Sequence, residues 1–382
     1  MWLCPAPLNQ CSVAYTPRSR QANARQANHA SLPPPPRRPA LTHFFLRHTL
    51  ALRTPRPMRP QNEHGSIPAR SESSPPGTIL VGVAGWSYDD WNGVVYPAHR
   101  PRGFHEARFL SQYFDAIEIN TSFYSPLRPD SASHWLEFVS GNPRFQFTAK
   151  LWQKFTHEMG ATAGDDKAVR DGFAPLLSAG RLGAVLLQFP FSFHQTPENL
   201  QRLKQLLDRF GDYPLVVEVR HASWSHPDFY ELLRERSVGI CNIDQPVIGK
   251  SITPGKLATS AIGYFRLHGR RYDTWFSDAL LARSEDDPEV PRHERYNYLY
   301  REQELLPWAG RVRDVAGHAK TTFVVANNHF QGKAAVNALQ FVYLLTGEKV
   351  NVPDSLRSHY PQLDSIASEP AREPTLFPLP PK

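Results

Sequence analysis

Short apolar runs of strand length alternate with longer amphipathic segments from residue 79 to residue 347. The run PLVVEVRH, residues 214–221, is typical of the first kind, because β-branched valines are enriched in strands and a proline marks its start. The segment TPENLQRLKQLLDRF, residues 196–210, is typical of the second kind, with Thr196 as N-cap and Pro197 at the first helical position. These two patterns predict eight strands, at residues 79–86, 116–120, 145–150, 182–190, 214–221, 238–244, 262–269 and 321–328. They also predict helices at residues 104–114, 132–139, 167–179, 196–210, 226–236, 296–316 and 332–347.

Alternation of strand and helix predicts a parallel sheet that is covered by helices. Eight strands match a closed eight-stranded parallel β/α barrel of the TIM-barrel type, although the step from residue 244 to residue 262 contains no clear helix. A doubly wound open sheet is the alternative. It favours a glycine-rich phosphate loop after its first strand, where this chain has GWSYDDW, so we expect the barrel.

Polar residues gather at the carboxyl ends of the predicted strands. In PLVVEVRH, Glu218 and Arg220 share one strand face while Val217 and Val219 share the other. In a barrel the aliphatic face meets the helices, and the other face points inward and carries the chemistry at the C-terminal rim. The same alternation places these residues inward: Glu118, Asn120, Lys150, Gln188, Glu218, Arg220, Asp244, Arg266, His268 and Asn328.

Eight motifs resemble those of the domain-of-unknown-function family 72. They are GWSYDDWNGVVYP, EINTSFY, FQFTAKLWQKFTH, LLQFPFSF, VEVRHASW, YFRLHGRRYDTWF, YNYLYREQELLPWA and NNHFQGKAAVNA. They follow one another in order over residues 79–346, and neither the segment before residue 78 nor that after about Gly347 takes part. The resemblance implies a TIM-like barrel and implies no settled reaction.

Composition divides the chain into three parts: an N-terminal tail (1–77), a barrel domain (78–347) and a C-terminal extension with a proline-rich end (348–382). Residues 1–76 contain ten arginines, no lysine and two acids, so they account for eight positive charges; the net charge is +7, and the rest of the chain carries one negative charge. The composition of the tail predicts a disordered segment, and a targeting peptide or a translation start at Met58 are the alternatives. Three cysteines without paired spacing suit a reducing compartment, so we expect a cytoplasmic protein without a membrane span.

Glu118 and Glu218 are the predicted acid/base groups, with His268 and Lys150 as further catalytic candidates. Burial and like charge would raise the pKa of one carboxyl group, which separates acid from base. The alternative is a structural charge layer in which arginine and lysine neutralise both glutamates.

The remaining candidates would bind ligand. Arg220, Arg266, Lys150, His221 and His268 form a cationic half-ring that suits a phosphate or carboxylate. Aromatic residues in the loops after strands could stack on a ligand or simply plug the barrel mouth. The predicted ligand-binding residues are Trp86, Asn120, Tyr124, Gln188, Arg220, His221, Asp244, Arg266 and Asn328.

No cofactor is predicted. A divalent metal on Glu118, Glu218, Asp244 and His268 is the less favoured alternative, because the nearby arginines would repel a cation, so no metal site is predicted.

The leading functional hypothesis is an enzyme with acid/base chemistry on a small polar, anionic ligand such as a sugar phosphate. The alternatives are a barrel that processes or binds nucleic acid, motivated by aromatic residues among arginines, and a non-catalytic ligand-binding barrel. The sequence makes no prediction of oligomeric state.

Overall fold

The computed structural model describes residues 77–272 and 292–369. The predictions for the tail before residue 77 and for the proline-rich end lie outside the described residues.

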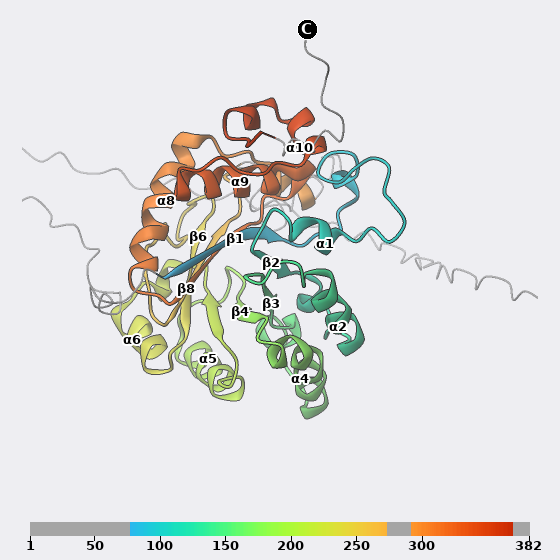
Figure 1. Ribbon diagram of the computed structural model, residues 1–382. Coiled ribbons are helices and arrows are strands. Elements are labelled where there is room, and N and C mark those ends of the chain that lie inside the picture. Colours follow the sequence, from blue (N-terminus) through green and yellow to red (C-terminus); the bar gives the residue numbers. More distant parts are fainter. Residues whose placement is uncertain (1–76, 273–291, 370–382) are drawn as a thin grey trace, which may run out of the picture. The chain divides into compact units, whose positions relative to one another are not determined.

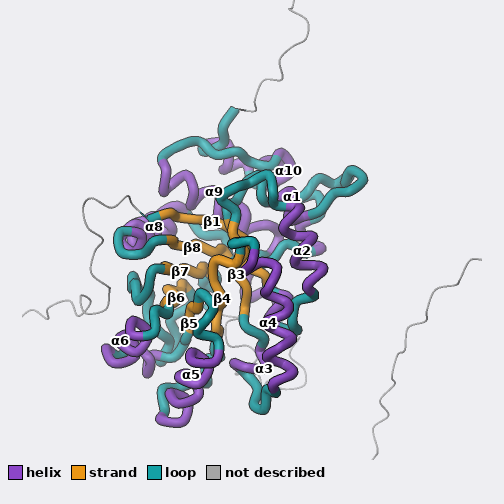
Figure 2. Tube along the Cα trace, turned by 60° about the horizontal axis from the view of Figure 1, so that its bottom comes forward, coloured by secondary structure: helices purple, strands orange, loops and turns teal. Residues whose placement is uncertain are grey.

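Eight parallel strands close into a barrel in sequence order, each paired with the next and β8 paired with β1. Figure 1 shows the strands at the centre of the molecule, and Figure 2 shows them from a second direction. The strands are β1 (Thr78–Ala84), β2 (Ala116–Ile119), β3 (Gln146–Lys150), β4 (Leu182–Gln188), β5 (Leu215–Glu218), β6 (Gly239–Asp244), β7 (Ile262–Leu267) and β8 (Thr321–Ala326). The predicted fold class is confirmed.

Helices surround the barrel (Figure 1). They are α1 (Glu106–Leu110), α2 (Pro129–Phe138), α3 (Gln153–Thr156), α4 (Ala163–Ser178), α5 (Pro197–Arg209), α6 (Pro227–Glu235), α8 (Glu302–Ala316), α9 (Lys333–Thr346) and α10 (Asp354–His359). As predicted, Thr196 caps α5 by accepting a hydrogen bond from the backbone N–H of Asn199, and Pro197 begins the helix. Residues 245–261, between β6 and β7, contain no helix, also as predicted.

The two faces of the strands form two separate apolar clusters. The outward faces pack with the helices into the larger cluster, which includes Val217 and Val219 of the segment PLVVEVRH. The inward faces form a smaller cluster that fills the barrel: Leu80, Ala84, Ala116, Ala184, Leu186, Val216, Cys241, Ile243, Tyr264, Phe323 and Val325. Because this plug occupies the middle of the barrel, the inward polar residues are left at the C-terminal ends of the strands.

Gly82 allows β1 and β2 to approach each other closely. A Cβ atom at this position would lie 1.7 Å from the backbone oxygen of Ala116, the residue paired with it on β2. Only glycine fits there without moving the strand.

The chain beyond Gly347 continues to pack against the same core. Val350, Val352 and Leu356 are buried members of the larger apolar cluster, and Ser355 donates a hydrogen bond to the backbone oxygen of Val95 at 2.9 Å. In both views α10 lies beside α9 (Figure 1 and Figure 2).

Some predicted helices differ in length from those observed. The helix predicted at residues 104–114 is only Glu106–Leu110, and the one predicted at 296–316 begins at Glu302 after a separate 3-10 turn, Arg292–Tyr296. The short α3 was not predicted, because four residues are too few to show a helical period.

Candidate functional site

Arg266 is the centre of a buried ion network at the C-terminal end of the barrel. Its side chain is completely buried and points inward from β7. Nη2 donates to Oε1 of Glu118 on β2 at 2.8 Å, and Nη1 donates to Oε2 of Glu218 on β5 at 2.6 Å. Nη1 also lies 2.9 Å from Oε1 of Gln188, the last residue of β4. One guanidinium group therefore joins two carboxylates across the barrel, as its planar fork allows.

Two further cations lie at the outer edge of this network. Arg220 contacts Oε1 of Glu218 through Nε at 3.0 Å and Nη2 at 2.8 Å. Lys150, the last residue of β3, lies 3.5 Å from Oε1 of Glu118 through Nζ. Arg220 is held by two hydrogen bonds, whereas Lys150 has one long ion pair and no hydrogen bond from Nζ within the described parts of the chain.

Neutral polar groups of the barrel interior also contact the two carboxylates. The hydroxyl of Tyr264 donates to Oε2 of Glu118 at 3.0 Å, and it lies 2.8 Å from the hydroxyl of Thr148. The thiol of Cys241 lies 3.9 Å from Oε2 of Glu218, and burial raises its pKa well above the usual value. Cys241 is therefore a neutral part of the core.

Both carboxylates are ionised. Burial is the largest single effect and by itself would raise the pKa of Glu118 and of Glu218, but Arg266 and the other donors together outweigh it. Lys150 contributes at Glu118, and Arg220 contributes at Glu218. The pKa of Glu118 is lowered, and that of Glu218 lies well below its usual range. The expected separation of the two carboxyl pKa values is not found, because a single arginine contacts both groups. Both carboxylates are completely buried, and their oxygens already accept hydrogen bonds from neighbouring side chains. This arrangement does not favour proton exchange with a ligand.

The pKa of Lys150 is moved toward neutrality by its surroundings. Burial lowers the pKa of its ammonium most, and Arg266 lowers it further, while Glu118 and Glu218 offset only part of this, so the value falls from 10.5 to about 8. An isolated ion pair would raise the pKa of the lysine. Since the pKa of Glu118 and that of Lys150 are both lowered, the charge of Glu118 is compensated chiefly by Arg266, at 2.8 Å, and only weakly by Lys150, at 3.5 Å.

His268 is neutral. Burial lowers its pKa to about 4, with Arg266 acting in the same direction against the contact with Glu218. Nδ1 lies 2.9 Å from Nδ2 of Asn327, and Nε2 lies 3.6 Å from Oε1 of Glu218. With the amide as placed, Asn327 donates to Nδ1, so the ring carries its proton on Nε2, toward Glu218.

The network carries one net positive charge, since three cations face two carboxylates and the imidazole of His268 is neutral. The charged side chains of the network also differ in how deeply they are buried. The side chains of Glu118, Glu218 and Arg266 are completely buried, whereas 11% of the Lys150 side chain and 19% of the Arg220 side chain are exposed. The end of the network that reaches solvent is therefore cationic.

The structure brings six of the predicted residues together in this network: Glu118, Lys150, Glu218, Arg220, Arg266 and His268. Gln188 joins them through Arg266.

Other predicted residues lie elsewhere. Asn328 is not the inward residue of β8, because its Nδ2 donates outward to the backbone oxygen of Tyr298 at 2.7 Å and to Oδ1 of Asn337 at 2.8 Å. The inward position belongs to Asn327, two residues after Val325 of the barrel plug. Asp244 also faces away from the network and pairs with Nε of Arg270 at 3.0 and 3.1 Å.

The remaining candidates have structural contacts. His221 accepts a hydrogen bond from the backbone N–H of Ser223 at 3.1 Å and stabilises the loop after β5. Trp86 packs edge-on against Trp135, with ring centroids 5.0 Å apart.

Asn120 and Tyr124 both follow β2 at the barrel mouth. Nδ2 of Asn120 donates to the hydroxyl of Tyr88 at 3.2 Å. The Tyr124 residue is 68% exposed.

His157 and Phe123 were missed by sequence reasoning. The Phe123 ring lies 5.7 Å from Nζ of Lys150 and 5.0 Å from the ring of His157, so it connects the histidine to the network. Partial burial lowers the pKa of His157, and Arg220 lowers it further, which also places it near the cations. Both residues lie in loops after strands, where no alternation of faces marks an inward position. Their place in the motifs EINTSFY and FQFTAKLWQKFTH was the only sequence signal that they belong near the site.

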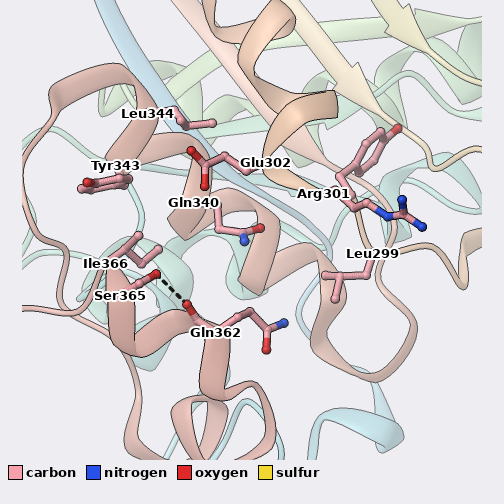
Figure 3. Close-up of a pocket in the computed structure, with 10 residues that line it drawn as sticks. Leu299, Arg301, Glu302, Gln340, Tyr343, Leu344, Gln362, Ser365 and Ile366 are labelled. Carbon is pink, nitrogen blue, oxygen red and sulfur yellow. Dashed lines mark hydrogen bonds between the residues drawn. The ribbon is translucent and has the colours of Figure 1, made fainter.

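A separate cavity of about 430 Å³ lies away from the network, between the start of α8, α9 and the C-terminal segment (Figure 3). It is lined by Leu299, Tyr300, Arg301, Glu302, Gln340, Tyr343, Leu344, Gln362, Ser365 and Ile366. None of these residues was a predicted site residue.

Across residues 77–272 and 292–369, no three histidine, cysteine, aspartate or glutamate side chains are grouped as metal ligands. None of the helices described is long and apolar enough to cross a membrane.

Comparison with known proteins agrees with the fold. The UPF0759 protein YunF of Bacillus subtilis is 30% identical over 281 residues, which cover 70% of this chain and 94% of that protein. The UPF0759 protein YecE of Escherichia coli K12 is 25% identical over 218 residues, which cover 56% of this chain and 69% of that protein. The crystal structure of a DUF72 family protein from Thermotoga maritima superposes with a TM-score of 0.60 at 33% identity, covering 70% of this chain and 99% of that one.

The family model described as "Protein of unknown function DUF72" matches residues 80–362. This match includes β2 to β8 completely and β1 from Leu80. It also extends past Gly347 into the segment that packs beside α9, so the expectation that the family resemblance ends at about Gly347 was wrong. The chain therefore belongs to the DUF72 family.

Proposed function

We propose that the C-terminal mouth of the barrel binds a small anion bearing a phosphate or carboxylate, and that the protein is an enzyme acting on this ligand. The observation that carries the proposal is the net charge of the network. It contains one more cation than carboxylates, and both carboxylates are completely buried. A buried excess charge is unfavourable unless an opposite charge approaches it. An anion at the mouth would neutralise it.

Donors for such an anion remain available on the two outer cations. Arg220 uses Nε and Nη2 on Glu218, which leaves Nη1 without a partner among the described residues. Nζ of Lys150 makes no hydrogen bond within the same described ranges. A guanidinium N–H and an ammonium are the usual donors to phosphate and carboxylate oxygens.

Lys150 is the group best suited to acid/base work in this enzyme. A catalytic pKa near the operating pH is the most effective, and Lys150, at about 8, is closer to it than either buried carboxylate, whose pKa is lowered. The proposal thus makes Lys150, and neither carboxylate, the reactive group, and gives Glu118 and Glu218 the role of counter-ions that position Arg266.

Calorimetric titration with inorganic phosphate tests the binding site. Wild-type protein is expected to bind phosphate, and Arg220→Gln is expected to weaken binding at least about tenfold, or about 1.4 kcal/mol. The matched control is Arg236→Gln, because Arg236 pairs with Asp208 at the surface after α6, at 3.2 Å. Unchanged binding in Arg220→Gln, or no binding by the wild type at millimolar phosphate, would contradict the proposal.

A second candidate function is binding of single-stranded nucleic acid at the same mouth. Two exposed tyrosines in loops after β2 and β7 favour it, Tyr124 at 68% and Tyr272 at 56% exposure, since exposed aromatic rings can stack on bases. Salt distinguishes the two. Oligonucleotide affinity should fall steeply between about 0.05 and 0.2 M salt, because several phosphates are neutralised at once, whereas the affinity for a single phosphate should fall much less.

A further inference from the structure

We propose that Lys150 is a nucleophile that forms an imine with a small aldehyde or ketone carrying a carboxylate or phosphate. This deepens the proposed function and rests on it, because the anionic group of the substrate would be held by the cations of the mouth. It adds a covalent step and narrows the substrate to a carbonyl compound.

The geometry of Lys150 differs from that of a structural lysine. Nζ lies at the end of β3, largely enclosed, with its one ion-pair partner at 3.5 Å. The oxygen it faces, Oε1 of Glu118, is already taken by Arg266 at 2.8 Å. The amine is thus fixed in position without being strongly held as an ammonium.

Its neighbours favour the neutral amine. A lysine that is desolvated and close to another cation loses its proton readily, which is how nucleophilic lysines are activated. Here burial and Arg266 supply both conditions. The centroid of the Phe123 ring lies 5.7 Å from Nζ on one side of the amine, and this weak contact with the ammonium does not prevent the lowering of the pKa.

The covalent step balances without any further reactant. The lone pair of Nζ attacks the carbonyl carbon, and the C=O π electrons move to oxygen to give a carbinolamine. Both protons of the neutral amine pass to that oxygen, which leaves as water as the C=N bond forms. Hydrolysis by one water returns the free lysine and the carbonyl compound.

Reductive trapping tests this step on the full chain. The protein is incubated near pH 7.5 with glyoxylate, a small aldehyde with a carboxylate, and sodium cyanoborohydride, and labelled lysines are located by peptide mass spectrometry. A pKa of about 8 leaves about a quarter of the Lys150 amine neutral at this pH, against about 0.1% for an ordinary lysine. Lys150 is therefore expected to gain a carboxymethyl group at least about tenfold faster than Lys167, whose side chain is 77% exposed.

Two controls complete the design. Lys150→Arg should lose the label at this position and leave labelling of Lys167 unchanged. Glycolaldehyde, which has no charge, should give a smaller ratio of Lys150 to Lys167 labelling than glyoxylate does.

The outcomes separate this inference from the proposed function. Phosphate binding by the wild type together with labelling of Lys150 no faster than Lys167 would overturn the imine and leave the anion site standing. Fast labelling with equal ratios for glyoxylate and glycolaldehyde would support the nucleophile and overturn the anionic substrate. Absence of both phosphate binding and labelling would overturn both proposals.

Discussion

Replacing Lys150 by methionine should make the protein more stable at neutral pH. The pKa of Lys150 falls from 10.5 to about 8 in the folded protein, so the charged side chain is less favourable there than in the unfolded chain. At about 1.4 kcal/mol for each tenfold change in equilibrium, this difference corresponds to about 3 kcal/mol. Methionine has a similar length and no charge, and Glu118 keeps its contacts with Arg266 and Tyr264.

The sign of the pH dependence follows from proton binding. Between pH 8 and 10.5 the unfolded chain holds the proton of Lys150 and the folded protein does not, so the stability of the wild type rises with pH across this window. The advantage of Lys150→Met is therefore full below about pH 8 and disappears by about pH 10.5.

Urea unfolding of wild type and Lys150→Met at pH 7 and pH 10 measures both effects. We expect the variant to be more stable by up to about 3 kcal/mol at pH 7, and by much less at pH 10. Lys167→Met, at an exposed position on α4, is the control and should change little. A Lys150→Met variant less stable than wild type by more than about 1 kcal/mol at pH 7 would refute the reasoning, because it would make Lys150 a structural partner of Glu118.

Four further predictions concern other parts of the molecule. Glu218→Gln should destabilise the protein by more than about 2 kcal/mol in urea, because it leaves part of the buried guanidinium charge unpaired; an unchanged midpoint would mean that Glu218 is held for function instead. As pH falls from 6.5 toward 4, protonation of His268 in the unfolded chain should lower the stability of the wild type by up to about 3 kcal/mol, and His157, whose pKa is also lowered to about 4, should add to this loss; His268→Gln should remove the first part and flatten the slope in acid titrations of stability. Gly82→Ala should cost about 3 kcal/mol in the same unfolding assay and Gly141→Ala much less, because a Cβ at the second position meets nothing within 4 Å; equal costs would remove the strand-contact argument. Deleting residues 1–57 should leave the melting temperature within about 2 °C, as all strands of the closed barrel lie after residue 77, and a drop of several degrees in calorimetry would contradict this.

The fold could be predicted because the strands carry their own periodicity. Val217 and Val219 against Glu218 and Arg220 fix which face of that strand meets the helices, and Thr196 with Pro197 marks where a helix begins. Such local signals recur along the chain, so their order alone indicates a barrel.

The last strand shows where this reasoning fails. In TTFVVANN both faces are aliphatic, since Val324 and Val325 point to opposite clusters, and the pattern could not tell that Asn327 and not Asn328 faces inward. Short contacts across the barrel are equally invisible in the sequence. The sharing of Arg266 between Glu118 and Glu218 depends on distances across the barrel, and it reverses the expected pKa of one carboxyl group.

We expect Lys150 to belong to a cationic mouth that is incomplete without an anion. An NMR pH titration of the lysine side chains, with the Lys150 signal assigned by its loss in Lys150→Arg, tests it directly when run without and with inorganic phosphate. We expect a Lys150 pKa of about 8 in the free protein and a higher pKa with phosphate, because a bound anion favours the ammonium form. A pKa near 10.5 in the free protein, or one that phosphate leaves unchanged, would contradict it.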